Sequence, residues 1–183
     1  MGNRNESAKV LQTKHLLASQ LMELLKNRSL KKISVNDICQ GALISRSTFY
    51  LHFEDKYRLL QYCFEKEIGR WETSTRGKTA QETILYILDA ILEKKGFYYH
   101  TFMDEPVQEQ IEILHSVFAR IFMDKLREKE KAGYELPGPA SIVSAFYAGG
   151  IATANIQWIR SNFDIPKEEM AECQRKLLSA IFP

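Results

Sequence analysis

Apolar residues recur at intervals of three and four positions along most of the chain, and this spacing constrains the fold more than any other feature. In a helix with 3.6 residues per turn, such a repeat lays the apolar side chains along one face. No segment alternates apolar and polar residues as a half-buried strand does. The sequence therefore predicts an all-α protein of about nine helices. The first spans about residues 5–26, with an apolar face of Val10, Leu11, Leu17, Ala18, Leu21, Leu24 and Leu25.

Capping residues predict where the next helices begin. Ser34, followed three residues later by Asp37, forms a capping-box pattern and opens a short helix that ends near residue 42. Ser45 is expected to cap a second short helix, and Asp55 a longer one. These three helix starts fall within about twenty residues, so the two short helices are separated only by a tight turn.

Breaks in the apolar repeat divide the rest of the chain. The polar segment 73–78 is interpreted as a joint, and the helix after it is expected to stop at Gly96. The clearest loop is the glycine- and proline-rich segment 133–139. An unusually apolar helix is expected over residues 140–160, and Pro166 opens the last one.

Positive charge is concentrated at the beginning of the chain. Residues 1–58 contain ten Lys and Arg against five Asp and Glu, a formal charge of +5, whereas the whole chain carries +2. A basic end on a mildly acidic body is typical of a head that binds a polyanion, although basic residues on solvated faces also explain the count. We expect a DNA-binding domain over residues 1–55 and a helical domain for effector sensing and dimerisation over residues 56–183.

Several classes of site are absent from the sequence. Cys39, Cys63 and Cys173 are too few and too scattered for a disulfide framework, and neither they nor the four histidines have metal-ligand spacing. No glycine-rich phosphate loop, nucleophile elbow, signal peptide or long apolar run occurs. We therefore expect a cytoplasmic protein that is not an enzyme and that holds no metal or cofactor.

Residues 34–60, SVNDICQGALISRSTFYLHFEDKYRLL, carry the most specific pattern. Two short helices cannot bury enough surface alone, so they must pack on the preceding helix and present the second short helix outward. Phe49 and Phe53 are expected to anchor that helix inward. Donor, hydroxyl and aromatic side chains on its outer face suit a DNA major groove. Those left exposed are Arg46, Ser47, Tyr50 and Leu51.

The same segment resembles the DNA-binding domain of the tetracycline-repressor (TetR) family of bacterial regulators. The resemblance covers roughly residues 9–64 and rests on residues 38–45 together with Thr48, Phe49, Tyr50, His52, Phe53, Lys56, Leu59 and Leu60. It implies a helix-turn-helix that binds double-stranded operator DNA as a homodimer. The DNA-contacting residues that it implies are Ser34, Ser45, Arg46, Ser47, Thr48, Tyr50, His52 and Lys56.

Two positions depart from the family pattern. Leu43 stands at the turn position usually filled by Gly, and Gly41 stands where the family tends to place Ala. A residue other than Gly at positive φ is strained by about 1–3 kcal/mol, so we expect either strain or a reshaped turn.

Small residues beside aromatic ones mark the last two helices as a candidate dimer interface. Small side chains let helices approach closely, and aromatic neighbours supply buried area. In the TetR family these helices usually form a four-helix bundle between subunits, while the alternative is a helix buried within one monomer. The candidate interface residues are Gly149, Gly150, Ala154, Trp158, Leu177 and Ile181.

Aromatic residues in the middle of the chain are candidates for a ligand pocket, because sensor pockets are mostly apolar with a few polar groups. Such a set also occurs simply as core. The candidates are Tyr98, Tyr99, Phe102, Phe118, Phe122 and Tyr147.

Two functions fit these features. The first is a ligand-responsive repressor that binds a pseudo-palindromic operator as a dimer and changes its half-site spacing when a small molecule binds. The alternative is a coactivator whose C-terminal domain binds a partner protein. A pocket in that domain distinguishes the two, since only the first requires one.

Overall fold

The computed structural model describes residues 8–103 and 108–179, which fold into helices joined by short loops. No strand occurs in these ranges, so the predicted all-α class is confirmed. The nine α-helices and one 3-10 turn, η1, of the described ranges are α1 (Ala8–Leu24), η1 (Leu30–Lys32), α2 (Val35–Ala42), α3 (Arg46–His52), α4 (Lys56–Ser74), α5 (Ala80–Glu93), α6 (Lys95–Met103), α7 (Gln108–Lys131), α8 (Ala140–Arg160) and α9 (Lys167–Leu178).

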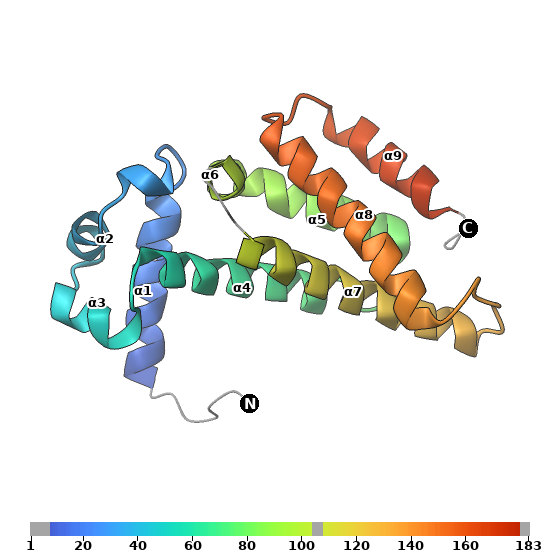
Figure 1. Ribbon diagram of the computed structural model, residues 1–183, viewed down its shortest axis with the longest axis horizontal. Helices are drawn as coiled ribbons and strands as arrows, with labels where there is room; N and C mark the ends of the chain where they lie inside the picture. Colours follow the sequence, from blue (N-terminus) through green and yellow to red (C-terminus); the bar gives the residue numbers. More distant parts are fainter. Residues whose placement is uncertain (1–7, 104–107, 180–183) are drawn as a thin grey trace.

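Helices α1 to α3 form a small head at one end of the molecule (Figure 1). The apolar face of α1 packs against α2 and α4, and α2 packs against α3. Leu17 and Leu21 of α1, Ile38 of α2 and Phe49 of α3 are all fully buried there. The head core is thus built from the apolar repeats that the sequence displays.

The three predicted helix caps are confirmed. Ser34 accepts the backbone N–H of Asp37, whose carboxylate accepts the backbone N–H of Ser34, completing a capping box. Ser45 accepts the backbone N–H of Thr48 at the start of α3. Asp55 accepts two backbone N–H groups in the first turn of α4. Each cap satisfies helix-terminal N–H groups that otherwise lack partners.

The remaining helices form a larger body, and α4 extends from the head along it (Figure 1). Helix α7 packs against both α4 and α8, α6 packs against α8, and α9 packs against α5. Buried aromatic rings join these helices: Trp71 of α4 lies 5.8 Å from Tyr98 of α6 and 6.0 Å from Phe118 of α7, between ring centroids. Aromatic pairs at such distances add to the stabilisation that burial provides.

The prediction that Gly96 stops a helix is wrong. Helix α5 ends at Glu93, and Gly96 lies inside the first turn of α6. Glycine stands at position 96 because two chain segments approach closely there. A Cβ placed on Gly96 would lie 2.3 Å from the backbone oxygen of Lys26, just after α1. Glycine is required because the start of α6 touches the backbone at the end of the first helix.

This contact predicts opposite outcomes for two glycine substitutions. Gly96→Ala should lower the free energy of unfolding by about 1–3 kcal/mol, because the Lys26 backbone cannot yield as a flexible side chain would. The matched control is Gly69→Ala in the middle of α4, where a Cβ meets nothing within 4 Å. That change should raise the free energy of unfolding by about 0.5–1 kcal/mol. Urea unfolding followed by circular dichroism measures both; equal effects would contradict the contact.

Candidate nucleic-acid interface

Two phenylalanines anchor helix α3 to the rest of the head. Phe49 is fully buried, and Phe53 at its end is also buried. Their ring centroids are 5.9 Å apart, and Phe53 lies 5.5 Å from Tyr62 of α4. Because these rings are four residues apart, they share one face of α3, and the opposite face points away from the core.

Hydroxyl groups cluster at the N-terminus of α3. The Ser45 Oγ lies 2.9 Å from the Ser47 Oγ and 2.8 Å from the Thr48 Oγ1, and it also accepts the backbone N–H of Thr48 at 3.1 Å. Arg46, the first residue of the helix, is exposed beside them. A charged guanidinium, three hydroxyls and the positive end of a helix are therefore brought together at one exposed point.

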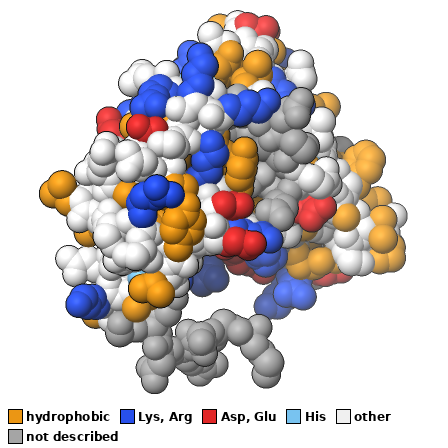
Figure 2. All heavy atoms as spheres, turned by 60° about the vertical axis from the view of Figure 1, so that its left-hand side comes forward, with side chains coloured by type: hydrophobic (Ala, Val, Ile, Leu, Met, Phe, Trp, Pro, Cys, Tyr) orange, Lys and Arg blue, Asp and Glu red, His pale blue; other side chains and the backbone are white. Residues whose placement is uncertain are grey.

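The residues predicted to face outward on α3 are exposed. Arg46, Ser47, Tyr50 and Leu51 all lie on the surface, whereas Thr48 and His52 are partly covered. Figure 2 turns this end of the molecule toward the viewer, and Lys and Arg side chains are spread over the visible face with exposed hydrophobic side chains among them. Cationic and apolar groups are thus available together on this side.

The turn between α2 and α3 contains a left-handed residue, and this residue is a leucine where the family usually has glycine. Leu43 has φ 55° and ψ 39°, and its backbone N–H donates to the carbonyls of Cys39 and Gln40. Its side chain is 93% exposed. Of the two outcomes expected from the sequence, the structure shows strain rather than a reshaped turn, since this region is unfavourable for a residue with a Cβ.

Gly41 lies beside a side chain of α1. A Cβ built on Gly41 would lie 2.2 Å from the Nε2 atom of Gln20, at the far end of a long flexible side chain. That end can shift at little cost, so this contact does not require glycine at position 41.

Ser34 and Lys56 both make hydrogen bonds within the head. The Ser34 hydroxyl donates to the Asp37 carboxylate at 2.8 Å. The Lys56 ammonium donates to the backbone oxygens of Leu30 and Ile33 at 2.8 Å and 2.7 Å, which ties the start of α4 to η1. An ammonium has three N–H groups, so these two bonds leave Lys56 one further donor.

Two basic residues near Ser34 are not among the DNA-contacting candidates that the sequence predicts. Lys31 and Lys32 lie on η1, and both are exposed. The sequence signal that could have identified them is a pair of adjacent lysines two residues before the cap Ser34. These lysines add positive charge on the same side as the N-terminus of α2.

Hydrogen bonds lower the pKa of the Asp37 carboxyl. The main cause is the backbone N–H of Ser34, followed by the Ser34 hydroxyl, with a further contribution from the nearby Arg28. Because the folded-state pKa is depressed, the stabilisation is present above the unfolded pKa of an aspartate. It is lost as the pH falls through the folded-state pKa.

The second predicted surface lies on α8. Ile142 and Phe146, one helical turn apart, are 66% and 75% exposed. Gly150 is exposed on the next turn, and neither it nor Gly149 has an atom within 4 Å of where a Cβ would stand. An exposed apolar strip on a helix that is otherwise packed makes this face of α8 a candidate contact surface.

The predicted interface residues do not all lie on this surface. Ala154 is partly covered, and Leu177 of α9 is 60% exposed. Trp158 is buried within the single chain, where its indole N–H donates to the backbone oxygen of Ile165 at 2.7 Å and its ring packs on Phe163. It therefore stabilises the turn after α8 and does not face outward. Ile181 lies outside the described residues.

The six aromatic candidates for a ligand pocket lie in different surroundings. Tyr98 and Phe102 are buried against Phe64 of α4. Tyr99 and Tyr147 are only partly buried. Phe118 and Phe122 line a narrow apolar pocket between α5, α7, α8 and α9. The structure thus brings two of the six to one pocket.

The described ranges contain neither a metal-binding cluster nor a membrane-spanning helix. No cluster of His, Cys, Asp or Glu there could hold a metal ion. Likewise, none of the helices in these ranges is long and apolar enough to cross a membrane.

Two known sequence families match the chain. Residues 19–63 match the family described as "Bacterial regulatory proteins, tetR family", and residues 78–180 match the one described as "Transcriptional regulator C-terminal region". The first match contains the helix-turn-helix, and the second covers more than half of the chain.

Individual relatives agree with these matches. The dhaKLM operon transcriptional activator DhaS of Lactococcus lactis subsp. lactis (strain IL1403) is 29% identical over 87 residues, which are 48% of this chain and 46% of that protein. The chain therefore aligns with about half the length of this curated relative.

Solved structures give a separate comparison. The dihydroxyacetone kinase operon activator DhaS has a TM-score of 0.74 at 21% identity, and the match covers 94% of this chain and 97% of that chain. RolR in complex with resorcinol has a TM-score of 0.70 at 18% identity, covering 94% and 90%. These likenesses show the fold.

The strained turn predicts a stabilising substitution. Leu43→Asn should raise the free energy of unfolding by about 0.5–1 kcal/mol, because Asn tolerates the left-handed conformation and the exposed leucine loses no packing. The matched control is Leu51→Asn, an exposed leucine inside α3, which should be neutral or slightly destabilising because Asn is a weaker helix former. If urea unfolding shows no gain for Leu43→Asn over this control, the strain is not present in solution.

Proposed function

The chain belongs to the TetR family of bacterial transcriptional regulators, and on that premise we propose that it is a ligand-responsive repressor that binds a pseudo-palindromic operator as a homodimer. Regulators of this family bind DNA and small ligands and usually act as dimers. The chain is accordingly a DNA-binding regulator rather than an enzyme. Because operator DNA lies in the cytoplasm, we place the protein there.

One observation carries this proposal: the exposed N-terminus of α3, with Arg46 beside the hydroxyl cluster of Ser45, Ser47 and Thr48. A helix fits the major groove, and the N-terminal residues of a recognition helix meet the base edges. We assign base contacts to Arg46 and Ser47, because a guanidinium can donate two hydrogen bonds to guanine. Thr48 and the cap Ser45 hold the helix terminus that faces the DNA.

Other residues of the head are placed to contact phosphates. The N-terminus of α2 at Ser34 presents backbone N–H groups, and the third Lys56 donor lies close by. We assign backbone contacts also to Tyr50 and His52 on α3. Lys31 and Lys32 are added to this set because they are exposed beside Ser34. Such contacts fix the position of the head on the duplex and give no sequence preference.

Dimerisation is assigned to the exposed strip of α8 and to α9. Ile142, Phe146 and Leu177 are apolar and mostly exposed in the single chain, and a second copy would cover them. The open surroundings of Gly149 and Gly150 allow a partner helix to approach closely. We expect the interface to bury more than about 1,000 Å² in total and to set the two α3 helices about 34 Å apart.

The body, residues 56–183, is assigned to effector sensing, and the boundary with the head at residue 55 coincides with the cap of α4. The apolar pocket of Phe118 and Phe122 has a volume of only about 20 Å³, so the choice of a small-molecule effector over a partner protein rests on the family and not on this pocket. The related RolR structure is in complex with a small molecule, resorcinol. We infer repression because a dimer seated on an operator blocks the access of polymerase, and expression from a reporter gene tests this direction.

The recognition-helix assignment predicts losses of DNA affinity without loss of fold. Arg46→Ala should weaken binding to the cognate operator by about ten- to a hundredfold, because a base contact is lost. Tyr50→Phe should weaken it by a few fold, because one hydroxyl contact to the backbone is lost. Gel-shift titration at fixed salt, with operators selected from random DNA, measures both.

The matched control for this experiment is Arg127→Ala. Arg127 is an exposed arginine on α7 in the body, away from α3. It should leave operator affinity unchanged. The assignment of α3 is overturned if Arg46→Ala binds as tightly as the wild type while all variants keep the same melting temperature.

The dimer assignment predicts that Gly150→Leu gives a folded monomer. A leucine is accommodated within the single chain, since a Cβ on Gly150 meets no atom within 4 Å, but it would collide with a partner helix. Sedimentation velocity at micromolar concentration measures the oligomeric state, and operator affinity should fall with it because half-site spacing is no longer enforced.

Gly69→Leu is the control here, because Gly69 is also open but lies on α4, outside the proposed interface. It should remain a dimer. A monomeric wild type, or a Gly150→Leu variant that stays fully dimeric, would show that this face of α8 is not the interface.

A further inference from the structure

Two leucines at α3 are the most exposed large hydrophobic side chains in the described ranges. Leu43, in the turn before α3, is 93% exposed, and Leu51, within α3, is 80% exposed. The next most exposed, Phe146 and Ile142, belong to the strip of α8 that is assigned to the dimer. Two such side chains on one small element make this side of the head a second candidate contact surface.

Leu51 lies on the face of α3 that carries a proposed base contact. Ser47 and Leu51 are four residues apart, so their side chains lie on one face of the helix, about 6 Å apart along its axis. The buried Phe49 and Phe53 occupy the opposite face. A helix that brings Ser47 to the base edges therefore brings Leu51 to the same groove.

Leu43 lies where the chain reverses between α2 and α3. Figure 1 places this turn at the outer edge of the head, on the side away from the body. The side chain gains almost no burial there, and its φ of 55° is unfavourable for a residue with a Cβ. Neither packing nor backbone conformation within the single chain favours leucine at this position, so a contact outside the chain is the remaining physical reason for it.

The charge around the two leucines favours DNA as their partner over another protein. Arg46 is exposed at the start of α3, Lys31 and Lys32 are exposed on η1, and residues 1–58 carry a formal charge of +5. This charge attracts a polyanion. In the major groove, the apolar group that a base presents is the 5-methyl group of thymine, which apolar side chains contact.

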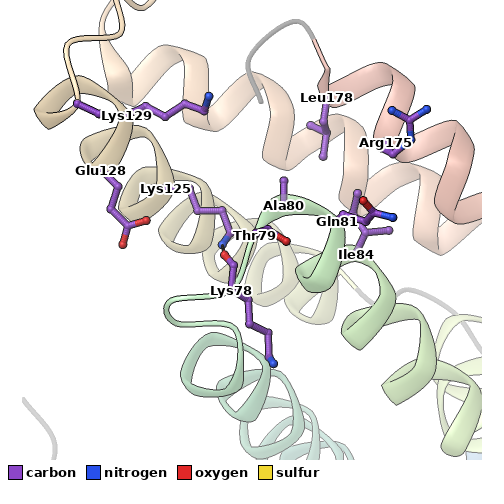
Figure 3. A pocket seen from close by; sticks show the side chains of 11 residues that line it. Lys78, Thr79, Ala80, Gln81, Ile84, Lys125, Glu128, Lys129, Arg175 and Leu178 are labelled. Atoms are coloured by element: carbon purple, nitrogen blue, oxygen red, sulfur yellow. Dashed lines mark hydrogen bonds between the residues drawn. The ribbon is translucent and has the colours of Figure 1, made fainter. Parts of the chain in front are cut away.

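The opposite end of the body also carries positive charge, but without exposed leucines. A cleft of about 500 Å³ lies there between the N-terminus of α5, α7 and α9 (Figure 3). Its larger apolar side chains, Ile84 and Leu178, are both buried. The head therefore differs from this cleft in having apolar side chains exposed beside its cations, as a surface that contacts base edges requires. The cations of the cleft are Lys78, Lys125, Lys129 and Arg175.

We propose that Leu43 and Leu51 contact the methyl groups of thymines in each operator half-site, and so determine sequence preference together with Arg46 and Ser47. The inference rests on the proposed function, because it requires α3 to lie in the major groove. Leucine has no hydrogen-bonding group in its side chain. It therefore favours thymine, with its methyl group, over cytosine, which presents an amino group to the groove.

Replacement of thymine by deoxyuridine tests this proposal, because it removes only the methyl group. Operators are first selected from random DNA with the full-length protein, and the selected half-sites should contain thymine at two or more fixed positions. Each thymine of one half-site is then replaced in turn, and affinity is measured by gel shift at fixed salt. At two of these positions the affinity should fall about three- to fivefold, because an apolar contact is lost. Selected half-sites without fixed thymines, or full affinity for every uracil-containing operator, overturn the proposal.

Two variants assign a methyl group to each leucine. Leu43→Asn and Leu51→Asn should each bind the thymine operator about three- to tenfold more weakly, and each should lose the response to uracil at a different position. Because Leu43→Asn is expected to be more stable than the wild type, loss of fold does not explain its weaker binding. The control Leu85→Asn, an exposed leucine on α5 in the body, should keep the wild-type affinity and both responses. Variants that bind more weakly but keep both responses to uracil would place the leucines against deoxyribose and overturn the thymine contacts.

Arg46→Ala distinguishes failure of this inference from failure of the proposed regulator. It should weaken binding to the thymine and uracil operators by the same factor, because its own contact is to another base. If Arg46→Ala weakens binding while uracil has no effect at any position, α3 remains the recognition helix and the thymine contacts are overturned. If neither change alters the affinity, the recognition helix and the thymine contacts are both wrong.

Discussion

One continuous helix, α4, supplies apolar side chains to the core of the head and to the core of the body, and the rest of the structure depends on this sharing. Near its start, Leu59 is fully buried beneath the head helices, and the Cys63 thiol donates to the backbone oxygen of Ala18 on α1. Further along, Phe64 and Trp71 pack against the rings of α6 and α7. Because its side chains pack into both cores, α4 joins the head to the body.

Additional contacts connect the head to the α5–α6 turn. Gly96 touches the Lys26 backbone. Two residues earlier, Lys94 pairs with Glu67, a buried acidic residue on α4 that also accepts a hydrogen bond from Arg70 at 2.9 Å. Burial, together with the nearby Glu67, raises the pKa of the Tyr98 phenol. Charged and aromatic groups of α4 and α6 thus lie together at the junction between the head and the body.

The sequence predicts local features well because they depend on neighbours in the chain. The caps at Ser34, Ser45 and Asp55, and the inward Phe49 beside an outward Tyr50, follow from spacing alone. Gly96 could not be interpreted correctly, because the reason for it is the Lys26 backbone seventy residues earlier. The inward direction of Trp158 depends on the turn that follows α8.

The ligand-pocket residues also depend on contacts between helices that are distant in sequence. The sequence suggests aromatic residues as pocket candidates, but Tyr98 and Phe102 pack against Phe64 and join α6 to α4. Lys125 looks like any lysine on a charged helix, and only the folded structure reveals that it lines both a surface cleft and the apolar pocket of Phe118 and Phe122. Predicting such a position requires knowing which helices are neighbours.

The Asn155–Gln174 hydrogen bond has a consequence for how the last two helices can move. Both side chains are buried, so sliding α9 along α8 by one residue would separate this pair and leave two amides without partners in an apolar layer. A polar pair of this kind fixes register, as a buried asparagine does in a coiled coil. The pair therefore opposes longitudinal sliding of α9 along α8, while the buried Met170 and Leu178 hold α9 against the body.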